Sequence, residues 1–148
     1  MKIALGSDHA GFPLKETIVD YLKITARPYK DFGVFSEESS DYPDNAAMVA
    51  QAVQSGEYAY GIIICGTGIG VSIAANKHNG IRAALCCEPY SARCAREHND
   101  ANVLAMGSRS IGPGLAISIV EAFLTTFFGG GRHSRRVDKI TSIESQRS

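Results

Sequence analysis

The sequence lacks an excess of either charge, because 15 lysine and arginine residues are balanced by 15 aspartate and glutamate residues. A chain without net charge creates no overall field that attracts nucleic acid or a membrane surface, so we expect neither as a partner. The chain also lacks an apolar run long enough to cross a bilayer, and its first residues do not follow the pattern of a secretory signal peptide. These absences predict a cytoplasmic globular protein.

The cysteines lack the spacing of a structural zinc site. No two of the four, at positions 65, 86, 87 and 94, are separated by two residues. Because Cys86 and Cys87 are adjacent and no secretory signal is present, we expect reduced thiols rather than a disulfide framework. Cys86, Cys87 and Cys94 are interpreted as small, buried apolar residues.

Segments typical of strands alternate along the chain with segments typical of helices. The patterns predict strands over Lys2–Gly6, Pro28–Phe32, Tyr60–Cys65, Ile81–Cys86 and Val103–Met106, and helices over Phe12–Lys23, Asp44–Ser55, Gly70–Lys77, Pro89–Asn99, Pro113–Phe127 and Val137–Gln146. Repeated strand–helix units with short connections predict a single α/β domain over residues 1–148. We expect a three-layer, Rossmann-like fold with a five-stranded parallel sheet. In such folds ligands bind at the carboxyl ends of the strands.

The end of the third predicted strand carries the most informative residues. The buried run before Cys65 is followed by Gly66, Gly68 and Gly70 at alternate positions, and then by a helical pattern. Glycines allow a tight turn that exposes main-chain N–H groups, and the start of the next helix adds partial positive charge. This field favours the thiolate of Cys65, so the sequence predicts a reactive sulfur beside a loop that can bind an anion. A tight structural turn with a buried apolar cysteine is the alternative interpretation.

The glycine pattern does not match the better-known phosphate loops. The full G-x-G-x-x-G spacing of dinucleotide sites is missing, and no acidic residue follows about 20 positions later. No Gly-Lys-Ser/Thr follows, which excludes a P-loop, and Val71 stands where a Cys-x5-Arg phosphatase loop requires arginine.

Other polar residues are placed to bind an anion or a sugar. Asp8 and His9 follow the first strand, where Asp8 could instead cap the next helix. His98 closes the fourth helix, where it could simply favour the helix dipole. Arg132 and Arg136 would share one face if their segment is helical, which suits a phosphate, but a solvated cationic segment is equally consistent with them.

These residues together resemble the ribose-5-phosphate isomerase B family, within a wider group that includes galactose-6-phosphate isomerase subunits. The resemblance extends in order over nearly the whole chain, through Gly6–Phe12, Asp41–Pro43, Cys65–Gly70, Ser72–Lys77, Gly80–Ala83, Glu88–Ala92, Glu97–Leu104, Gly107–Arg109 and Gly130–Val137.

The resemblance implies reversible conversion of ribose 5-phosphate and ribulose 5-phosphate with no metal and no cofactor. Cys65 would be the base that moves a proton between C1 and C2, and Thr67 would relay protons between the sugar oxygens. Some members of the family use an acid later in the loop, but Val71 and Ser72 stand there in this chain. His98 would open the furanose ring, helped by Asp8.

The resemblance also implies which residues bind the substrate. The enediolate oxygens would be held by the amides of Gly66, Thr67, Gly68, Ile69 and Gly70, the sugar by Asn99, and the phosphate by His9, Arg109, Arg132 and Arg136. It implies a homodimer, often paired into a tetramer, whose active sites are shared. His98, Asn99 and Arg109 would come from the neighbour, and the segment from about residue 130 to 148 would pack on that subunit.

Three alternatives remain open from the sequence. A six-carbon sugar phosphate, such as allose or galactose 6-phosphate, would change the depth of the pocket rather than the catalytic residues. The complete catalytic set in one chain argues against an obligate galactose-type complex of two gene products. A non-catalytic sugar-phosphate-binding module would keep its ligand affinity without Cys65, whereas a redox-sensing protein would be indifferent to sugar phosphates.

Overall fold

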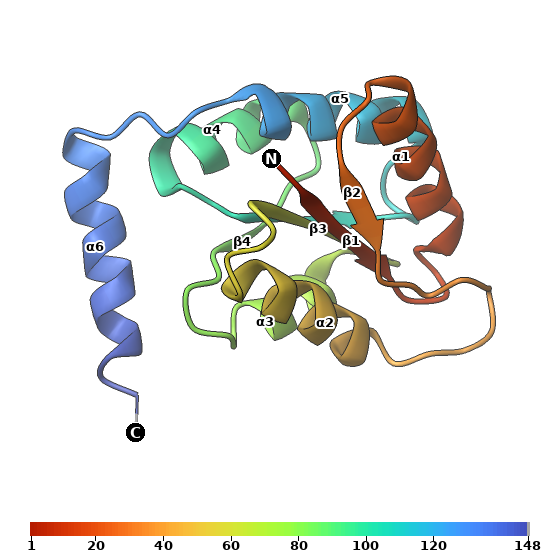
Figure 1. The fold of residues 1–148 in the computed structure, drawn as a ribbon, viewed down its shortest axis with the longest axis horizontal. Coiled ribbons are helices and arrows are strands. Elements are labelled where there is room, and N and C mark those ends of the chain that lie inside the picture. The colour runs from red at the N-terminus through yellow and green to blue at the C-terminus, as the bar shows by residue number, and fades with distance from the viewer. Residues whose placement is uncertain (148) are drawn as a thin grey trace.

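The fold is built on a five-stranded parallel sheet in the order β2-β1-β3-β5-β4 (Figure 1). The computed structural model describes residues 1–147. The strands are β1 (Ile3–Ser7), β2 (Tyr29–Asp31), β3 (Tyr60–Cys65), β4 (Ala83–Leu85) and β5 (Val103–Gly107). The helices are α1 (Phe12–Ile24), α2 (Tyr42–Gln54), α3 (Ile69–Ala75), α4 (Pro89–Asn99), α5 (Pro113–Thr125) and α6 (Arg132–Glu144). The predicted α/β class and parallel sheet are confirmed.

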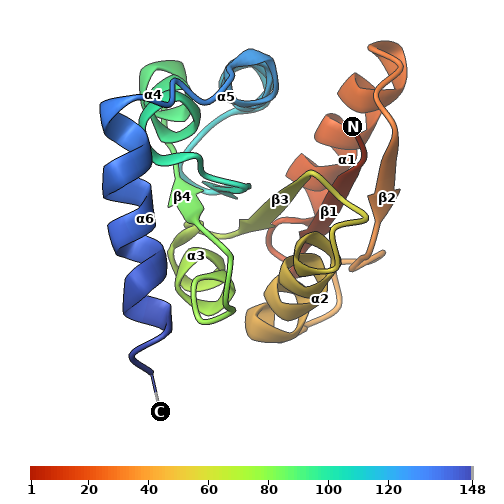
Figure 2. The same cartoon turned by 60° about the vertical axis from the view of Figure 1, so that its left-hand side comes forward.

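Two helical layers cover the sheet. One core cluster joins side chains of α1, α4 and α5 to one face, among them Ile18, Ala92 and Phe123. A second cluster joins α2 and α3 to the other face through residues such as Val49 and Val71. Figure 2 shows these two layers on either side of the strands. The central strands β1, β3 and β5 are buried on both faces, which explains their nearly continuous apolar sequences.

The strand order changes direction between β1 and β3. The chain first adds β2 on one side of β1 and then places β3 on the other side, with Ser7 opposite Ile64. Such a reversal opens a crevice at the carboxyl ends of the two strands, because their connections leave toward opposite faces. Asp8, which follows β1, and Cys65, which ends β3, therefore lie close together at this crevice.

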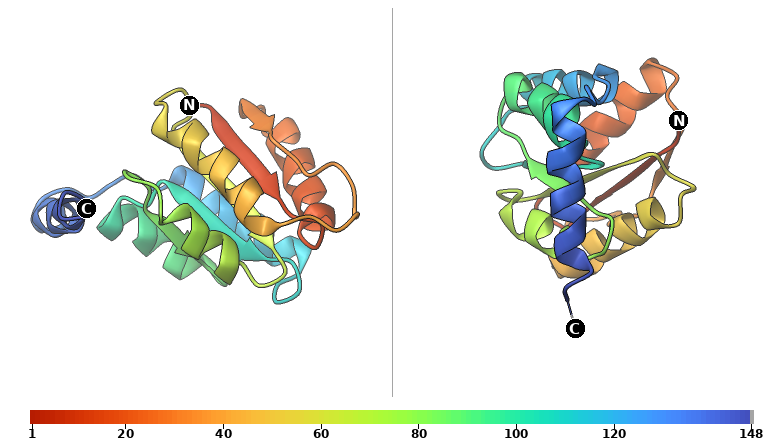
Figure 3. Two further views of the ribbon diagram at one scale, coloured as in Figure 1. Left: turned by 90° about the horizontal axis from the view of Figure 1, so that it is seen from below. Right: turned by 90° about the vertical axis from the view of Figure 1, so that its left-hand side faces the viewer.

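The last helix begins five residues earlier than the sequence predicted, at Arg132 rather than Val137. Three glycines precede it, and their conformational freedom obscured the true start of the helix. Of the described residues in α6, Val137 is the buried one, and the helix packs mainly against α4. Figure 3 shows α6 standing apart from the sheet and its two layers.

Other boundaries moved by a turn or less. α2 begins at Tyr42, two residues before the predicted start, because Pro43 fits the first turn of a helix rather than the loop before it. β4 covers only three of the six residues predicted for it. Ile81, which was predicted to begin this strand, belongs to the preceding turn, where its N–H donates to the His78 carbonyl oxygen at 3.2 Å.

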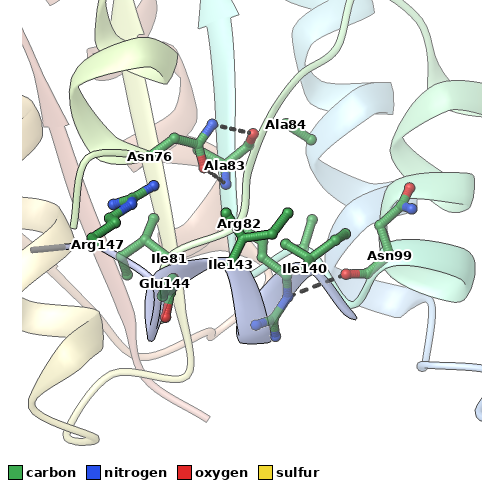
Figure 4. A pocket seen from close by; sticks show the side chains of 11 residues that line it. Asn76, Ile81, Arg82, Ala83, Ala84, Asn99, Ile140, Ile143, Glu144 and Arg147 are labelled. Carbon is green, nitrogen blue, oxygen red and sulfur yellow. Dashed lines mark hydrogen bonds between the residues drawn. The ribbon is translucent and has the colours of Figure 1, made fainter. Parts of the chain in front are cut away.

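The outer edge of β4 is closed by a side chain. The amide of Asn76, just after α3, donates to the Ala83 carbonyl oxygen at 3.0 Å and accepts from the Ala83 N–H at 2.8 Å. It therefore satisfies the two groups that Ala83 would offer to a further strand. Both bonds are drawn in Figure 4.

Candidate active site

A cavity of about 480 Å³ lies at the carboxyl ends of β1, β3 and β5. Its lining combines the reactive and charged residues predicted from the sequence with several apolar side chains: Asp8, His9, Ala10, Tyr42, Cys65, Gly66, Thr67, Ile69, Gly70, Ile73 and Arg109. It occupies the crevice where the strand order reverses. The structure thus brings together, in one cavity, the predicted site residues Asp8, His9, Cys65, Gly66, Thr67, Ile69, Gly70 and Arg109.

Cys65 is held in place by the loop that follows it. The residue is 5% exposed, and its Sγ accepts a hydrogen bond from the N–H of Gly68 at 3.2 Å. The carbonyl oxygen of Cys65 accepts from the N–H of Ser108 at 2.9 Å, which fixes the end of β3 against β5. The Gly68 N–H thus fixes the position of the sulfur beside the cavity.

The loop after Cys65 also provides main-chain donors. Among residues 1–147, the N–H groups of Gly66 and Thr67 have no hydrogen-bond partner. The exposed Thr67 turns its Oγ1 back to accept from the N–H of Ile69 at 3.2 Å. Two free N–H groups beside a buried sulfur can stabilise an oxygen that becomes negatively charged during a reaction.

Position 68 requires glycine, both because of its backbone conformation and because a side chain would not fit there. Its φ is +79°, and a Cβ added there would lie 2.5 Å from Leu85 Cδ1 and 2.8 Å from the Met106 carbonyl carbon. We expect Gly68→Ala to lower the free energy of unfolding by about 3 kcal/mol, combining left-handed strain with overpacking. Denaturant unfolding measures this change.

Gly80 supplies the matched control, because its φ is also +79° but a Cβ there would meet nothing within 4 Å. Gly80→Ala is expected to cost only the conformational part, about 1 kcal/mol. Equal losses for the two variants would contradict the close approach of the loop to β5.

Arg109 lies in the cavity of its own chain. Its guanidinium Nη1 is 3.3 Å from the position that a Cβ on Gly66 would occupy, and the main-chain N–H of Arg109 donates to the Gly66 carbonyl oxygen at 2.9 Å. Within one chain Arg109 therefore already lies beside Cys65, whereas the sequence analysis expected it to come from the neighbour. The reason is the register of the sheet, which places Cys65 opposite Gly107 and so brings the residues after both strands together.

Asp8 is also tied to the main chain. Its Oδ1 accepts from the N–H of Gly11 at 2.9 Å, immediately before α1, and the residue is 5% exposed. The N-cap of α1 is Gly11, and no side chain caps the helix, so the capping role suggested for Asp8 is wrong: its carboxylate instead braces the turn before α1 and lines the cavity.

The remaining predicted residues form a second cluster, made up of His98, Asn99, Arg132 and Arg136. His98 and Asn99 close α4, just before the amino end of β5, whereas Cys65 stands at the carboxyl end of β3. A five-residue strand such as β5 spans roughly 16 Å. The sheet therefore separates this cluster from Cys65 within one chain.

Two stacked imidazole rings join α6 to the end of α4. The rings of His98 and His133 are stacked with centroids 4.5 Å apart, and the Gly129 N–H donates to the Glu97 carbonyl oxygen at 2.9 Å. Loss of hydration, reinforced by His98 and by Arg132 and Arg136, lowers the pKa of His133 below its usual value. His133 is therefore mainly neutral at pH 7.

Buried arginine contacts fix the end of α4. Arg96, 5% exposed, donates from Nη1 to Asp100 Oδ1 at 2.9 Å and to the Ala101 carbonyl oxygen at 2.7 Å. Arg82 donates from Nε to the Asp100 carbonyl oxygen at 3.0 Å. These bonds hold Asp100 in a left-handed conformation with φ of 46°, so the position of His98 and Asn99 is set by a rigid turn.

Between α6 and the body lies a second cavity of about 410 Å³ (Figure 4). Asn99 lines it together with Ile140 and Ile143 of α6, and the N–H of Gly80 donates to Glu144 Oε1 at 2.8 Å. Ile140 and Ile143 are apolar, yet both remain partly exposed to solvent in this cavity.

Comparison with known proteins settles the family. The family model described as Ribose/Galactose Isomerase matches residues 3–140. The chain belongs to this family. Ribose-5-phosphate isomerase B of Escherichia coli (strain K12) is 54% identical over 147 residues, which cover 99% of each chain.

Solved structures of ribose/galactose isomerases agree with this fold over its full length. Ribose-5-phosphate isomerase B of Clostridium thermocellum matches with a TM-score of 0.98 and 55% identity over 100% of both chains. The Mycoplasma genitalium enzyme, solved with bound ribulose-5-phosphate, matches with a TM-score of 0.93 and 42% identity, covering 99% of this chain and 97% of that one. The family resemblance drawn from the motifs is confirmed.

Tyr42 and Ile73 line the cavity of this family member, but neither was predicted as a site residue. The ring of Tyr42 lies close to Gly70, where an added Cβ would be 2.6 Å from its Cε2. The only sequence indication was the segment Asp41–Pro43, which the family resemblance included without a role.

The other cysteines of this ribose/galactose isomerase differ from one another. Burial, reinforced by Glu88 and Cys87, raises the pKa of Cys86 to about 11, so Cys86 stays a protonated thiol at neutral pH. Cys94 is half-buried, and Cys87 is exposed, so the prediction that Cys87 is buried was wrong. Neither a three-residue cluster suited to a metal ion nor a helix able to span a bilayer is found within residues 1–147.

Proposed function

We propose that this chain interconverts ribose 5-phosphate and ribulose 5-phosphate as an aldose–ketose isomerase. The observation that carries the proposal is the buried Cys65 sulfur, which faces a sheet-end cavity beside free main-chain N–H groups. Moving a proton between two carbons requires a base and a stabilised oxyanion, and this loop offers both. Relatives named for the same reaction, one solved with bound ribulose-5-phosphate, support this substrate.

The proposed reaction begins by opening the furanose ring. His98 takes the proton from the hydroxyl on C1 and Asp8 assists as the ring oxygen receives a proton, so the C1–ring oxygen bond breaks and an aldehyde forms. His98 suits this role because an imidazole can gain and lose a proton near neutral pH.

In the central step, the thiolate of Cys65 removes the proton from C2, and the electron pair forms a C1–C2 double bond as charge moves to O1. The amides of Gly66–Gly70 stabilise the resulting enediolate. Thr67 carries a proton from O2 to O1, and Cys65 returns its proton to C1, which gives the ketose. Hydrogen atoms are conserved throughout, as isomerisation requires.

The proposed phosphate site combines His9 and Arg109 with Arg132 and Arg136, while Asn99 binds the sugar. Guanidinium groups suit a phosphate because they offer several parallel N–H donors. Arg132 and Arg136 are exposed on the first turns of α6, where their spacing places them on one face.

Two copies of the chain complete one site in this proposal. The separation of Cys65 from His98 by the length of the sheet supports a homodimer in which each cavity receives His98, Asn99 and the α6 arginines of a neighbour. The partly exposed apolar residues of α6, Ile140 and Ile143, support the packing of this helix on the second subunit.

Incubation with ribose 5-phosphate in D2O containing EDTA tests the proposed function. We expect NMR to show formation of ribulose 5-phosphate with solvent deuterium at C1, because the proton on Cys65 exchanges with solvent. The absence of both ketose and exchange would contradict the proposal.

A six-carbon substrate is the second candidate, because the matching family description also names galactose. Parallel incubations with allose 6-phosphate and galactose 6-phosphate decide between the two. We expect kcat/KM to be highest for ribose 5-phosphate, and a higher value for either hexose phosphate would overturn the substrate assignment.

A further inference from the structure

His9 is held at two points by one residue far along the chain. Its main-chain N–H donates to Ser40 Oγ at 3.0 Å, and its ring Nδ1 lies 3.1 Å from the N–H of Ser40. The two residues are 31 positions apart. Ser40 therefore fixes both the backbone and the ring of a residue that lines the cavity.

Within residues 1–147, the hydrogen bonds that tie the loop carrying Ser40 to the first two strands lie near the start of the loop. There the N–H of Val34 donates to the Ser7 carbonyl oxygen at 2.8 Å, and the N–H of Gly33 donates to Asp31 Oδ1 at 2.8 Å. Residues 35–39 are exposed, and Ser40 is where the loop becomes half-buried again. The bonds to His9 are thus the contact by which this loop returns to the sheet end.

The ring contact determines which nitrogen of a neutral His9 carries the proton. The Ser40 N–H can only donate, so Nδ1 must accept and the proton must sit on Nε2. The Ser40 carbonyl oxygen, 3.2 Å from Nδ1, can accept from that nitrogen only when Nδ1 is itself protonated. Since Nδ1 faces Ser40, Nε2 is the ring nitrogen left to serve the cavity as a donor.

We propose that Ser40 is a positioning residue, which holds His9 as the tautomer with hydrogen on Nε2 so that it donates to the phosphate of the substrate. The phosphate role of His9 rests on the proposed function. The tautomer does not, and it can be measured in the protein without substrate. A donor fixed in advance binds an anion without first having to reorient, which strengthens binding of substrate.

Nitrogen-15 NMR of the histidine rings tests the tautomer directly. We expect wild-type His9 to show a protonated Nε2 and an unprotonated Nδ1 above the pH at which the ring ionises. Ser40→Pro removes the main-chain N–H that donates to Nδ1, so its spectrum is expected to show a mixture of tautomers, whereas Ser40→Ala keeps that N–H and the wild-type tautomer. A neutral wild-type ring with hydrogen on Nδ1 would overturn the proposal.

Kinetics test the consequence for binding. We expect Ser40→Ala to raise KM for ribose 5-phosphate about fivefold with little change in kcat, and to weaken inorganic phosphate as a competitor by a similar factor. Ser40→Thr, which keeps the hydroxyl, should restore both values. Ser39→Ala is the matched control, because Ser39 is exposed on the same loop.

Two outcomes separate a positioning role from a merely structural one. An unchanged tautomer in Ser40→Pro together with an unchanged KM in Ser40→Ala would contradict the proposal, even if both variants have lower melting temperatures. If the wild-type protein does not isomerise ribose 5-phosphate, the proposed function fails, and the ring spectra together with binding of inorganic phosphate still decide the role of Ser40.

Discussion

Replacement of Cys65 with serine is expected to lower kcat for ribose 5-phosphate by about 1,000-fold, the usual contribution of a positioned base. A serine hydroxyl occupies nearly the same space in this buried site, yet it does not ionise at neutral pH and cannot take a proton from carbon. The free N–H groups of Gly66 and Thr67 are left intact. Substrate binding is therefore expected to survive while chemistry is lost.

The measurement is a steady-state assay combined with deuterium exchange at C2, which reports the proton transfer itself. Cys94→Ser is the matched control, since Cys94 is half-buried and lies outside the cavity. Wild-type exchange in the Cys65→Ser variant, with its fold verified by circular dichroism, would show that another group is the base.

Co-expression of two inactive variants is expected to restore activity. Cys65→Ser and His98→Asn each remove one half of the proposed shared site, so neither homodimer can turn over. Random pairing makes half of the dimers mixed, and each mixed dimer contains one complete site, so about one quarter of wild-type activity should return. This result would follow only if Cys65 and His98 act from different chains.

The control is a mixture of the two variants purified separately and kept from exchanging subunits, which should stay inactive. Mixed dimers detected by native mass spectrometry without any recovered activity would contradict a shared site. The experiment thus separates the assembly proposal from the identity of the base.

Local patterns were enough to predict the strand–helix alternation, because buried parallel strands such as β3 have continuous β-branched sequences bounded by glycine. The same patterns misplaced the start of α6. Helix α6 is amphipathic, but its first five residues, Arg132–Arg136, are all polar and follow three glycines, so no apolar residue marks the start of the helix before Val137.

For the candidate site too, local sequence patterns were sufficient for some residues and not for those placed by contacts between distant parts of the chain. Cys65 and its glycines form one continuous segment, so their chemistry could be predicted from sequence. The place of Arg109 beside Cys65 of the same chain was not expected, because it depends on which strand lies beside β3. Tyr42 and Ser40 were missed for a related reason: each reaches the cavity or His9 through a contact between distant parts of the chain.

The amide of Asn76 has a consequence for how copies of this chain can assemble. An unpaired sheet edge can recruit a strand from another molecule and grow without limit, which is a common route to aggregation. Because Asn76 occupies both hydrogen-bonding groups of Ala83, the β4 edge offers little to such a strand. A strand of another molecule therefore cannot extend the sheet at Ala83 without first displacing the Asn76 amide.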